Sequence, residues 1–514
     1  MGICGRGING LNHTLIFNVT GKTSVWQRNH GAYRIAHWLR VHNWDAEVID
    51  YALMWSFEDL VNLAKSRINK NTKFIGFSFL FDRWSDSDAL YKFTIWLNTN
   101  YPDITLISGS NLYPEKDAPV DYHIRGYGEV ALVKLLMYLF SNGIKPRMVE
   151  RDDYVKIINA DIYPAYPMKD YSVEYEARDF LQPWEFLSIE TARGCIFECT
   201  FCNHPLLGVK GDYSTTSEAF EKELKENWYR WGIKNYMTTE ETFNDRQDKV
   251  ERLGKVVQGL DFDPWFTGYI RLDLLIARPD ERKHLADMNF YGHYYGVETL
   301  NHKTAKAFKK GMHPDKVKEG LLSLKEYYSN TGKYRGTVSL ILGGPHEPID
   351  SMYQTLNWLI ENWNEHSVMP YPMYIPVGEL ARASELSRNY EKYGYKARDY
   401  SYFEEKYPDD TWALNRIKVS RFESILWENE HLDIVQALNI HKDFMDNISE
   451  KNFKVQNFSM PKFTAKTGSN NQDPPMEDRL ALTVREALDE LEDGDKRMEW
   501  HREYVTKKLN WGLL

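Results

Sequence analysis

The chain has 514 residues, of which 42% are hydrophobic and 27% charged, which excludes a disordered chain and suggests about three globular domains. No apolar run approaches the roughly 18 residues of a membrane span, and no apolar signal-peptide segment follows the N-terminus. We therefore expect a cytoplasmic protein without a membrane partner. Because the net charge is −10, we do not expect a nucleic-acid partner.

The first part of the chain alternates between strand-like and helix-like segments. Runs of β-branched and aromatic residues predict strands at 13–19, 46–51, 73–80, 104–110 and 121–126. Apolar residues at helical spacing predict helices at 31–42, 57–68, 87–101 and 128–140. Alternating βα units predict an α/β fold with a Rossmann-like, five-stranded parallel sheet over residues 1–143. Ligands of such a sheet bind beyond the C-terminal ends of its strands.

Residues 144–185 carry scattered prolines and are predicted to be a linker. A second βα series follows over residues 186–376. Its strands are predicted at 186–195, 234–241, 264–273, 289–299, 335–344 and 369–376, and its helices at 217–231, 245–260, 279–288, 301–329 and 349–365. Six units predict a partial (β/α)6 barrel with its chemistry at the C-terminal mouth of the strands. Residues 377–514 are predicted to be a mainly helical domain, with amphipathic helices at 476–509.

Three short motifs match known ligand signatures only in part. The run GRGING (5–10) precedes its strand, although a dinucleotide-binding loop would follow one. The run TGKTS (20–24) lacks the first glycine of a P-loop. The run DYHIRG (121–126) has the letters of a cobalt-binding histidine motif, but it lies on the fifth strand, so we expect His123 to be a packed strand residue.

Three of the four cysteines, Cys195, Cys199 and Cys202, lie together just after the first strand of the second series. Sulfur ligands at this spacing suit an iron–sulfur cluster or zinc. His204 would complete a Cys3His zinc site, whereas a catalytic metal centre would keep one position open. Cys4 is expected to be a thiol of the N-terminal tail.

The cysteine spacing C-x-x-x-C-x-aromatic-C, with Phe201 as the aromatic residue, resembles that of the radical S-adenosylmethionine (SAM) enzymes. The resemblance implies that the three cysteines bind three irons of a 4Fe–4S cluster and that the fourth iron binds SAM. Reductive cleavage of SAM would then give a 5′-deoxyadenosyl radical. It also implies an electron donor such as flavodoxin or ferredoxin, and an adenine-side contact for Phe201.

Four later segments resemble the other strand-end motifs of this family, in the expected order. In TTEETF (238–243), Glu240 and Glu241 are candidates for the methionine amino group. In YIRLDLL (269–275), Arg271 is a candidate for the methionine carboxylate. Glu298 is implied near the ribose or the substrate, and Gly343 and Gly344 are implied to let the backbone approach the adenosine.

The first βα series resembles the cobalamin-binding domain of one large radical SAM subfamily. Two turns carry this resemblance, and both match it only in part; they supply Ser108, Gly109, Ser110, Gly126 and Gly128. Because no histidine follows the first strand, a bound cobalamin is expected to have no histidine on cobalt. The loop after the third strand would then cover the lower cobalt face, with Trp84 as a steric cap.

The resemblance favours a cobalamin-dependent methyl transfer to an unactivated carbon of a small molecule or peptide. One SAM would methylate cobalamin, and a second would supply the radical. The alternatives are a radical cyclisation, epimerisation or rearrangement with cobalamin auxiliary or absent, and a non-enzymatic zinc or electron-transfer site. No catalytic acid or base is assigned. Four side chains are candidates to face the substrate: His204, His293, Tyr295 and His346.

Overall fold

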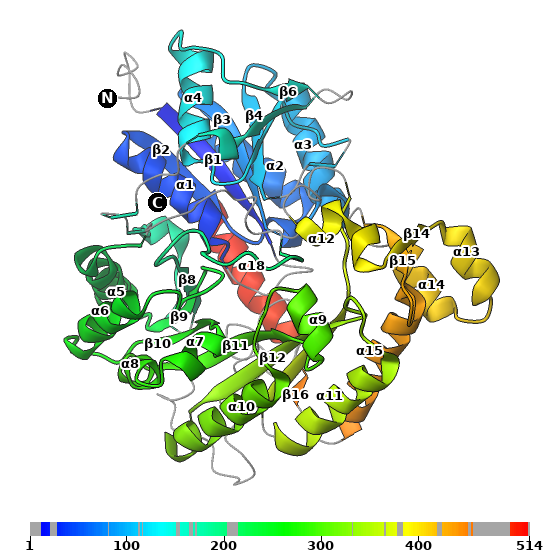
Figure 1. Cartoon of the computed structure of the whole chain (residues 1–514). Coiled ribbons are helices and arrows are strands. Elements are labelled where there is room, and N and C mark those ends of the chain that lie inside the picture. The colour runs from blue at the N-terminus through cyan, green and yellow to red at the C-terminus, as the bar shows by residue number, and fades with distance from the viewer. Residues whose placement is uncertain are drawn as a thin grey trace. The chain divides into compact units, whose positions relative to one another are not determined.

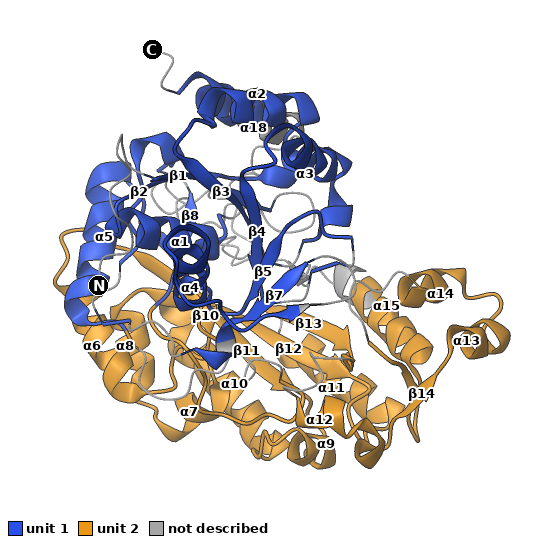
Figure 2. Cartoon of the chain, turned by 90° about the horizontal axis from the view of Figure 1, so that it is seen from above, with its two compact units in different colours: residues 1–190, 215–237, 475–514 blue, residues 191–214, 238–474 orange. Residues whose placement is uncertain are grey.

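The structure is a computed structural model, and Figure 1 traces it along the chain. It describes residues 12–20, 28–80, 82–111, 114–115, 117–150, 155–163, 168–169, 172–183, 185–202, 214–331, 333–363, 366–377, 384–418, 424–450, 454–455 and 494–511. The chain divides into two compact units (Figure 2): the first holds 1–190, 215–237 and 475–514, and the second holds 191–214 and 238–474. These units cut the chain differently from the four predicted segments, whose boundaries stay predictions.

The first unit is built on a parallel sheet. The sheet has the order β2-β1-β3-β4-β5-β7-β6 and consists of β1 (Asn12–Val19), β2 (Trp44–Ile49), β3 (Thr72–Phe79), β4 (Thr105–Ser110), β5 (Tyr122–Arg125), β7 (Lys156–Asn159) and β6 (Val149–Glu150). All pairs are parallel except β6 with β7. The five predicted strands are confirmed. The structure adds a sixth parallel strand, β7, from the segment that the sequence predicts to be a linker.

Helices cover both faces of this sheet (Figure 2). They are α1 (His30–Val41), α2 (Phe57–Arg67), α3 (Asp88–Asn100) and α4 (Glu129–Phe140). The first unit also holds α5 (Ser217–Trp231). Asn29, Ser56 and Ser87 begin the first three helices, since each side chain accepts a hydrogen bond from a first-turn amide. α1 and α4 lie on one face, where Arg34 of α1 pairs with Glu129 of α4.

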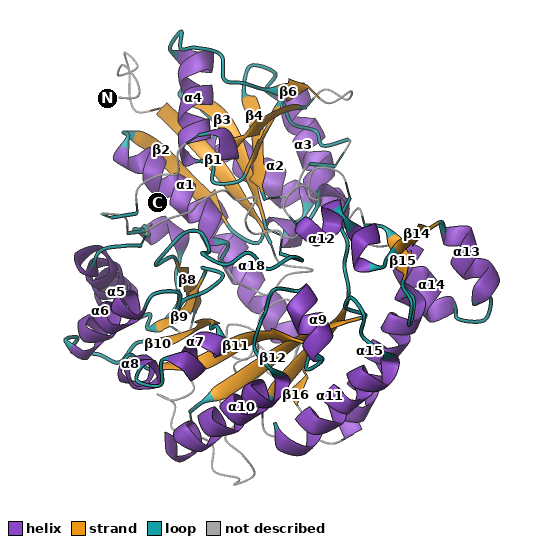
Figure 3. Cartoon of the chain, viewed as in Figure 1, coloured by secondary structure: helices purple, strands orange, loops and turns teal. Residues whose placement is uncertain are grey.

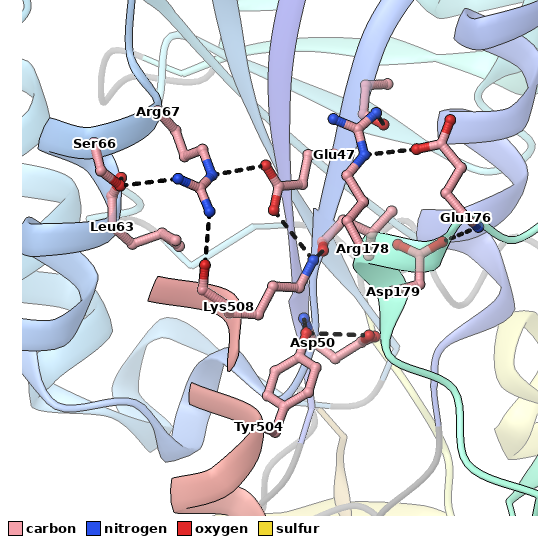
Figure 4. Close-up of polar contacts among 12 residues, drawn as sticks. Glu47, Asp50, Leu63, Ser66, Arg67, Glu176, Arg178, Asp179, Tyr504 and Lys508 are labelled. Carbon is pink, nitrogen blue, oxygen red and sulfur yellow. Dashed lines mark hydrogen bonds and ion pairs between the residues drawn. The ribbon is translucent and has the colours of Figure 1, made fainter. Parts of the chain in front are cut away.

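The last described helix, α18 (Gly494–Asn510), packs beside α2 in the first unit (Figure 4). The Lys508 ammonium is fully buried and contacts Glu47 Oε1 at 3.2 Å and the Val48 carbonyl oxygen at 2.6 Å. The Tyr504 hydroxyl accepts a hydrogen bond from the Asp50 amide at 2.9 Å. The end of the chain is therefore tied to the end of β2 by buried polar contacts.

The central sheet has the order β16-β13-β12-β11-β10-β9-β8. Its strands are β8 (Phe186–Ile189), β9 (Asn235–Thr238), β10 (Trp265–Tyr269), β11 (Phe290–Glu298), β12 (Arg335–Leu342), β13 (Ser367–Pro372) and β16 (Lys454–Val455), and its helices are α6 (Gln247–Gln258), α7 (Leu272–Ala277), α8 (Glu281–Asp287), α9 (His302–Ala307), α10 (Pro314–Tyr328) and α11 (Ile349–Asn362). The six predicted strands are present in chain order, and the neighbouring strands from β10 through β13 to β16 pair in parallel. The partial barrel is confirmed (Figure 3).

The rest of the second unit is mainly helical, as predicted. It consists of α12 (Glu385–Arg388), β14 (Lys396–Arg398), α13 (Tyr400–Lys406), α14 (Thr411–Lys418), β15 (Leu426–Glu428) and α15 (Ile434–Glu450). β14 and β15 form a small antiparallel sheet that the sequence did not predict. Tyr395, Trp427 and Leu432 join one hydrophobic cluster with Phe308 and Leu342, so this region packs on the carboxyl end of β12. None of the helices in the described ranges is long and apolar enough to cross a membrane.

Candidate active site

The three clustered cysteines lie on the loop that follows β8. Gly194, just before the first of them, has a φ of +88°, which favours glycine at that turn. Cys195, Cys199 and Cys202 are free thiols of intermediate exposure, and the Cys202 amide donates to the Cys199 carbonyl oxygen at 3.1 Å. His204, the candidate zinc ligand, lies outside the described residues.

Two polar side chains from the ends of other strands reach the cysteine sulfurs. The Thr242 Oγ1 lies 3.7 Å from Cys195 Sγ, and Arg271 Nη1 donates to Cys199 Sγ at 3.6 Å. Burial raises the pKa of the Cys195 thiol, and its hydrogen bonds lower it in part. The structure thus brings the predicted residue Arg271 to the cysteine loop, and it adds Thr242 as a contact that the sequence analysis did not single out.

The donor set of this loop fits an iron–sulfur cluster. In such a cluster each cysteine binds a separate iron, so three cysteines leave one iron of a four-iron cluster open. Within the described part of the chain, no three His, Cys, Asp or Glu side chains converge closely enough to hold one metal ion. Ligation of separate irons does not require such convergence. The three cysteines would hold the cluster, and the loop contributes three sulfurs that are not in disulfides.

Glu240 and Glu241 follow β9, but they differ in burial. Glu240 is only 4% exposed, and its Oε1 accepts a hydrogen bond from the Thr191 hydroxyl. Its Oε2 is buried without a hydrogen-bond partner among the described residues, whereas Glu241 is exposed. Burial raises the pKa of Glu240, and Lys249 and Thr191 oppose that rise. A buried carboxylate oxygen that lacks a donor suits a cationic amino group, so Glu240 is the better candidate of the two.

Glu298 and Phe201 are linked through Lys310. Glu298 ends β11 with a φ of +68°, and its carboxylate lies 3.3 Å from Lys310 Nζ. The same ammonium lies 5.8 Å from the centroid of the Phe201 ring, which packs edge-on against Phe308. Both predicted SAM contacts therefore lie beside the same residue, Lys310, which was not among the predicted contacts.

Gly343 and Gly344 are required by packing within the chain itself. Gly343 has a φ of +82°, and a Cβ there would lie 2.4 Å from the Trp427 ring. A Cβ on Gly344 would lie 2.5 Å from the Thr304 methyl group. The motif predicts that both glycines let the backbone approach the adenosine. Packing against Trp427 and Thr304 already explains why glycine is needed at these positions, and an adenosine contact stays a prediction.

The helical region after the barrel holds the cysteine loop directly. The Thr200 carbonyl oxygen, between Cys199 and Cys202, accepts hydrogen bonds from the Ser384 hydroxyl at 2.7 Å and the Leu386 amide at 2.8 Å. The Thr200 hydroxyl donates to the Ala307 carbonyl oxygen at 2.8 Å. Residues 184 positions later in the chain thus fix the backbone of the loop.

We expect Ser384→Ala to loosen this loop without unfolding the second unit. The change removes one buried hydrogen bond to the Thr200 carbonyl oxygen and the N-terminal cap of α12, a loss of about 1–2 kcal/mol. Iron release to a chelator should become several times faster. Ser329→Ala is the control, because its exposed hydroxyl bonds only within its own helix end. Equal release rates for both variants would contradict the loop contact.

Glu347 is a buried carboxyl group just beyond the glycine pair. Its Oε1 accepts a hydrogen bond from the Thr299 hydroxyl at 2.7 Å, and burial raises its pKa from the usual 4.5 to about 8. The folded state therefore keeps a proton that the unfolded chain releases above pH 4.5. The resulting stability is complete below that pH and is lost as the pH rises through about 8.

Glu347→Gln is expected to reduce this pH dependence, because the amide is neutral at every pH. Between pH 6 and pH 9, the melting temperature should fall less in the variant than in the wild type. Glu319→Gln, at an exposed position, is the control and should follow the wild-type profile. A variant whose melting temperature falls as steeply as that of the wild type would show that Glu347 is ionised in the folded protein.

Small residues line the carboxyl ends of β4 and β5 in the first unit. Ser108 is buried, and its hydroxyl lies 2.8 Å from His123 Nδ1, so His123 is a packed strand residue as expected. Among the described residues, a Cβ on Gly109 would meet only the Ile124 carbonyl oxygen, at an ordinary 3.5 Å, and Gly126 has a φ of +93°. Packing within that part of the chain does not explain Gly109, and a strand end without bulky side chains fits a flat ligand such as a corrin.

The remaining predicted cobalamin contacts differ in what the structure says of them. Ser110 ends β4, and Gly128 precedes α4, where a Cβ would lie 3.4 Å from Ile124 Cγ2. Trp84 is 3% exposed and packs edge-on against Phe77 and Phe79, with ring centroids 4.9 and 4.8 Å apart. Its ring is already used in packing, and its role as a cap stays a prediction.

Two of the candidate substrate-facing residues are committed to the core of the second unit. His293 and Tyr295 are fully buried, and His293 Nδ1 lies 2.6 Å from the Tyr295 hydroxyl, which lies 2.9 Å from that of Tyr334. Burial lowers the pKa of His293 to about 4. His346 is partly exposed, and its Nδ1 lies 3.0 Å from Glu430 Oε1. We therefore assign no catalytic acid or base among them.

The fold and the cysteine loop together define an α/β protein with three clustered cysteines at the mouth of a partial barrel. Residues 189–359 match the model of the Radical SAM superfamily. The match begins at the end of β8 and includes all three cysteines. No curated protein matches the chain in sequence.

Two solved structures with a similar fold are OxsB, a cobalamin-dependent radical SAM enzyme, and TsrM, a radical SAM methyltransferase. OxsB with aqua-cobalamin and SAM bound matches with a TM-score of 0.53 and 15% identity, over 74% of this chain and 56% of that chain. The methyltransferase TsrM from Kitasatospora setae, with cobalamin and a 4Fe–4S cluster bound, matches with a TM-score of 0.55 and 12% identity, over 76% of this chain and 81% of that one. At these identities the matches show a shared fold. The chain spans little more than half the length of OxsB.

Proposed function

We propose that this protein is a cobalamin-dependent radical SAM methyltransferase that acts on an unactivated carbon. The observation that carries the proposal is the combination, in one chain, of a three-cysteine loop in a radical SAM domain and a parallel sheet domain. TsrM, a radical SAM methyltransferase whose structure holds cobalamin and a 4Fe–4S cluster, shares the fold over 81% of its own length.

The bound groups would supply a carbon-centred radical from SAM and a methyl group carried by cobalamin. Around the cluster, Glu240 would hold the methionine amino group, and Glu298 with Lys310 would lie at the ribose or the substrate. Phe201 would contact the adenine side. In the first unit, the small residues at the carboxyl ends of β4 and β5 would lie under the corrin. The substrate would be a small molecule or a peptide, and a flavodoxin- or ferredoxin-like protein in the cytoplasm would supply electrons.

The proposal is tested with the full chain reconstituted anaerobically with iron and sulfide, then incubated with hydroxocobalamin. After gel filtration, the visible spectrum should show a retained corrinoid. After reduction in the presence of SAM, 5′-deoxyadenosine should form, and S-adenosylhomocysteine should form only in the corrinoid-loaded sample, as transfer of the SAM methyl group requires.

Each failure has its own meaning. Formation of 5′-deoxyadenosine without corrinoid retention would refute methyl transfer and favour a radical cyclisation, epimerisation or rearrangement. Absence of 5′-deoxyadenosine from protein that holds a reducible cluster would refute radical SAM catalysis. Failure to bind iron and sulfide at all would favour a zinc site.

A further inference from the structure

Arg271 lies between three groups that together fix the direction of its guanidinium. It precedes α7, and its side chain is 11% exposed. The Nε and Nη2 atoms donate to the two carboxylate oxygens of Asp273 at 2.9 and 2.6 Å. The guanidinium carbon lies 3.5 Å from the centroid of the Phe197 ring, which is on the cysteine loop. The planar group is therefore held both at one edge and across its face.

The remaining nitrogen of this guanidinium is directed at a cluster ligand. Arg271 Nη1 donates to Cys199 Sγ at 3.6 Å, within the range of a hydrogen bond to sulfur. Arginine stays protonated at every pH at which the protein is folded, so the contact places a permanent positive charge and an N–H donor beside one sulfur. Asp273 pairs with the Nε and Nη2 atoms, so Nη1 stays directed at the Cys199 sulfur.

This arrangement bears on the expected role of Arg271 as a carboxylate contact. The edge formed by Nε and Nη2 is suited to a bidentate pair with a carboxylate, and Asp273 already occupies it. The methionine carboxylate of SAM would have to displace Asp273 or use the edge that faces Cys199. These contacts favour a role of Arg271 at the Cys199 sulfur.

We propose that Arg271 raises the reduction potential of the cluster by donating a hydrogen bond to the Cys199 thiolate, with Asp273 as the residue that positions it. This inference rests on the cluster that the proposed function requires. Reduction adds one electron from the reductant and makes the cluster and its thiolates more negative. A donor N–H and a positive charge at a ligand sulfur stabilise that state more than the oxidised state, since hydrogen bonds to the sulfurs and local charge set such potentials.

The chain offers a matched control at an arginine outside the cysteine loop. Arg398 pairs with Glu428, and its guanidinium carbon lies 5.0 Å from the centroid of the Tyr402 ring. Its described contacts therefore resemble those of Arg271 but include no cysteine. Arg398→Gln should leave the potential unchanged, although it removes the same charge.

The test is a redox titration of the full, anaerobically reconstituted chain, with the reduced cluster measured by electron paramagnetic resonance. Arg271→Gln should make the midpoint potential more negative by about 59 mV. For a one-electron reduction, this shift corresponds to a tenfold change in the equilibrium constant. Arg271→Lys keeps the charge and should recover part of the shift. Iron and sulfide per chain are measured for each variant, so that incomplete clusters are not read as shifted ones.

Two results would overturn the proposal. The first is a midpoint for Arg271→Gln equal to that of the wild type in fully loaded protein. The second is a shift in Arg398→Gln as large as that in Arg271→Gln, which would indicate that the loss of a positive charge elsewhere in the chain has the same effect. SAM affinity, measured without reductant, tests whether Arg271 instead binds the methionine carboxylate. If Arg271→Gln weakened SAM binding and left the potential unchanged, Arg271 would be a SAM contact. Failure of the wild type to assemble a cluster would refute the proposed function itself.

Discussion

Cys199→Ala is expected to abolish the reductive cleavage of SAM by this protein. Cys199 lies in the middle of the cysteine loop, and its sulfur is the one that Arg271 contacts. Loss of a direct ligand should cost more than the roughly 100-fold that loss of an outer-shell partner can cost. The variant should bind less iron per chain, and 5′-deoxyadenosine should fall below detection after reduction with SAM.

Cys4→Ala is the matched control for this change, because it removes the one cysteine outside the clustered three. It should bind iron and form 5′-deoxyadenosine as the wild type does. If Cys199→Ala retained both the iron content and the 5′-deoxyadenosine yield of the wild type, the cysteine loop would not be the cluster site. If Cys4→Ala alone lost activity, the site would include the N-terminal segment.

The fold could be predicted from the sequence wherever segments were long and regularly patterned. Alternating strands and amphipathic helices predicted the first five strands of the N-terminal sheet and the six strands of the barrel. The strand β7 was missed because it has only four residues, and they follow a proline-containing stretch that reads as irregular. β14 and β15 are shorter still, and a three-residue strand carries no periodicity.

The candidate site could be predicted in outline because the carboxyl ends of parallel strands meet at one edge. That rule is enough to bring Cys199 and Arg271 together, although 72 residues separate them. The contact of Ser384 with Thr200 could not be predicted, since it depends on how a region without a motif packs on the barrel. Gly343 shows the same limit: its motif is visible in the sequence, but the Trp427 ring that requires glycine there is not.

Lys508→Met is expected to destabilise the first unit by about 3–5 kcal/mol, the usual cost of removing one partner from a buried ion pair. The ammonium is fully buried between Glu47 and the Val48 carbonyl oxygen, and Arg67 Nη2 donates to the Lys508 carbonyl oxygen at 2.6 Å (Figure 4). Burial would raise the pKa of Glu47, but Lys508 and Arg67 hold it below its usual value. Without Lys508, the Glu47 carboxylate keeps its ion pair with Arg67, at 3.2 Å, and loses its contact with the buried ammonium.

The neighbouring lysine provides the control for this prediction. Lys507 is partly exposed and pairs with Glu503 one helical turn away, so Lys507→Met should change stability by no more than about 0.5 kcal/mol. Hydrogen exchange of the α18 amides measures the effect locally, and it should accelerate strongly in Lys508→Met and hardly at all in Lys507→Met. The double variant Glu47→Gln with Lys508→Met should lose less stability than the sum of the single changes, because neither Glu47 nor Lys508 is then left charged without the other. Additive losses, or equal exchange in the two lysine variants, would mean that the buried pair does not hold the end of the chain to β2.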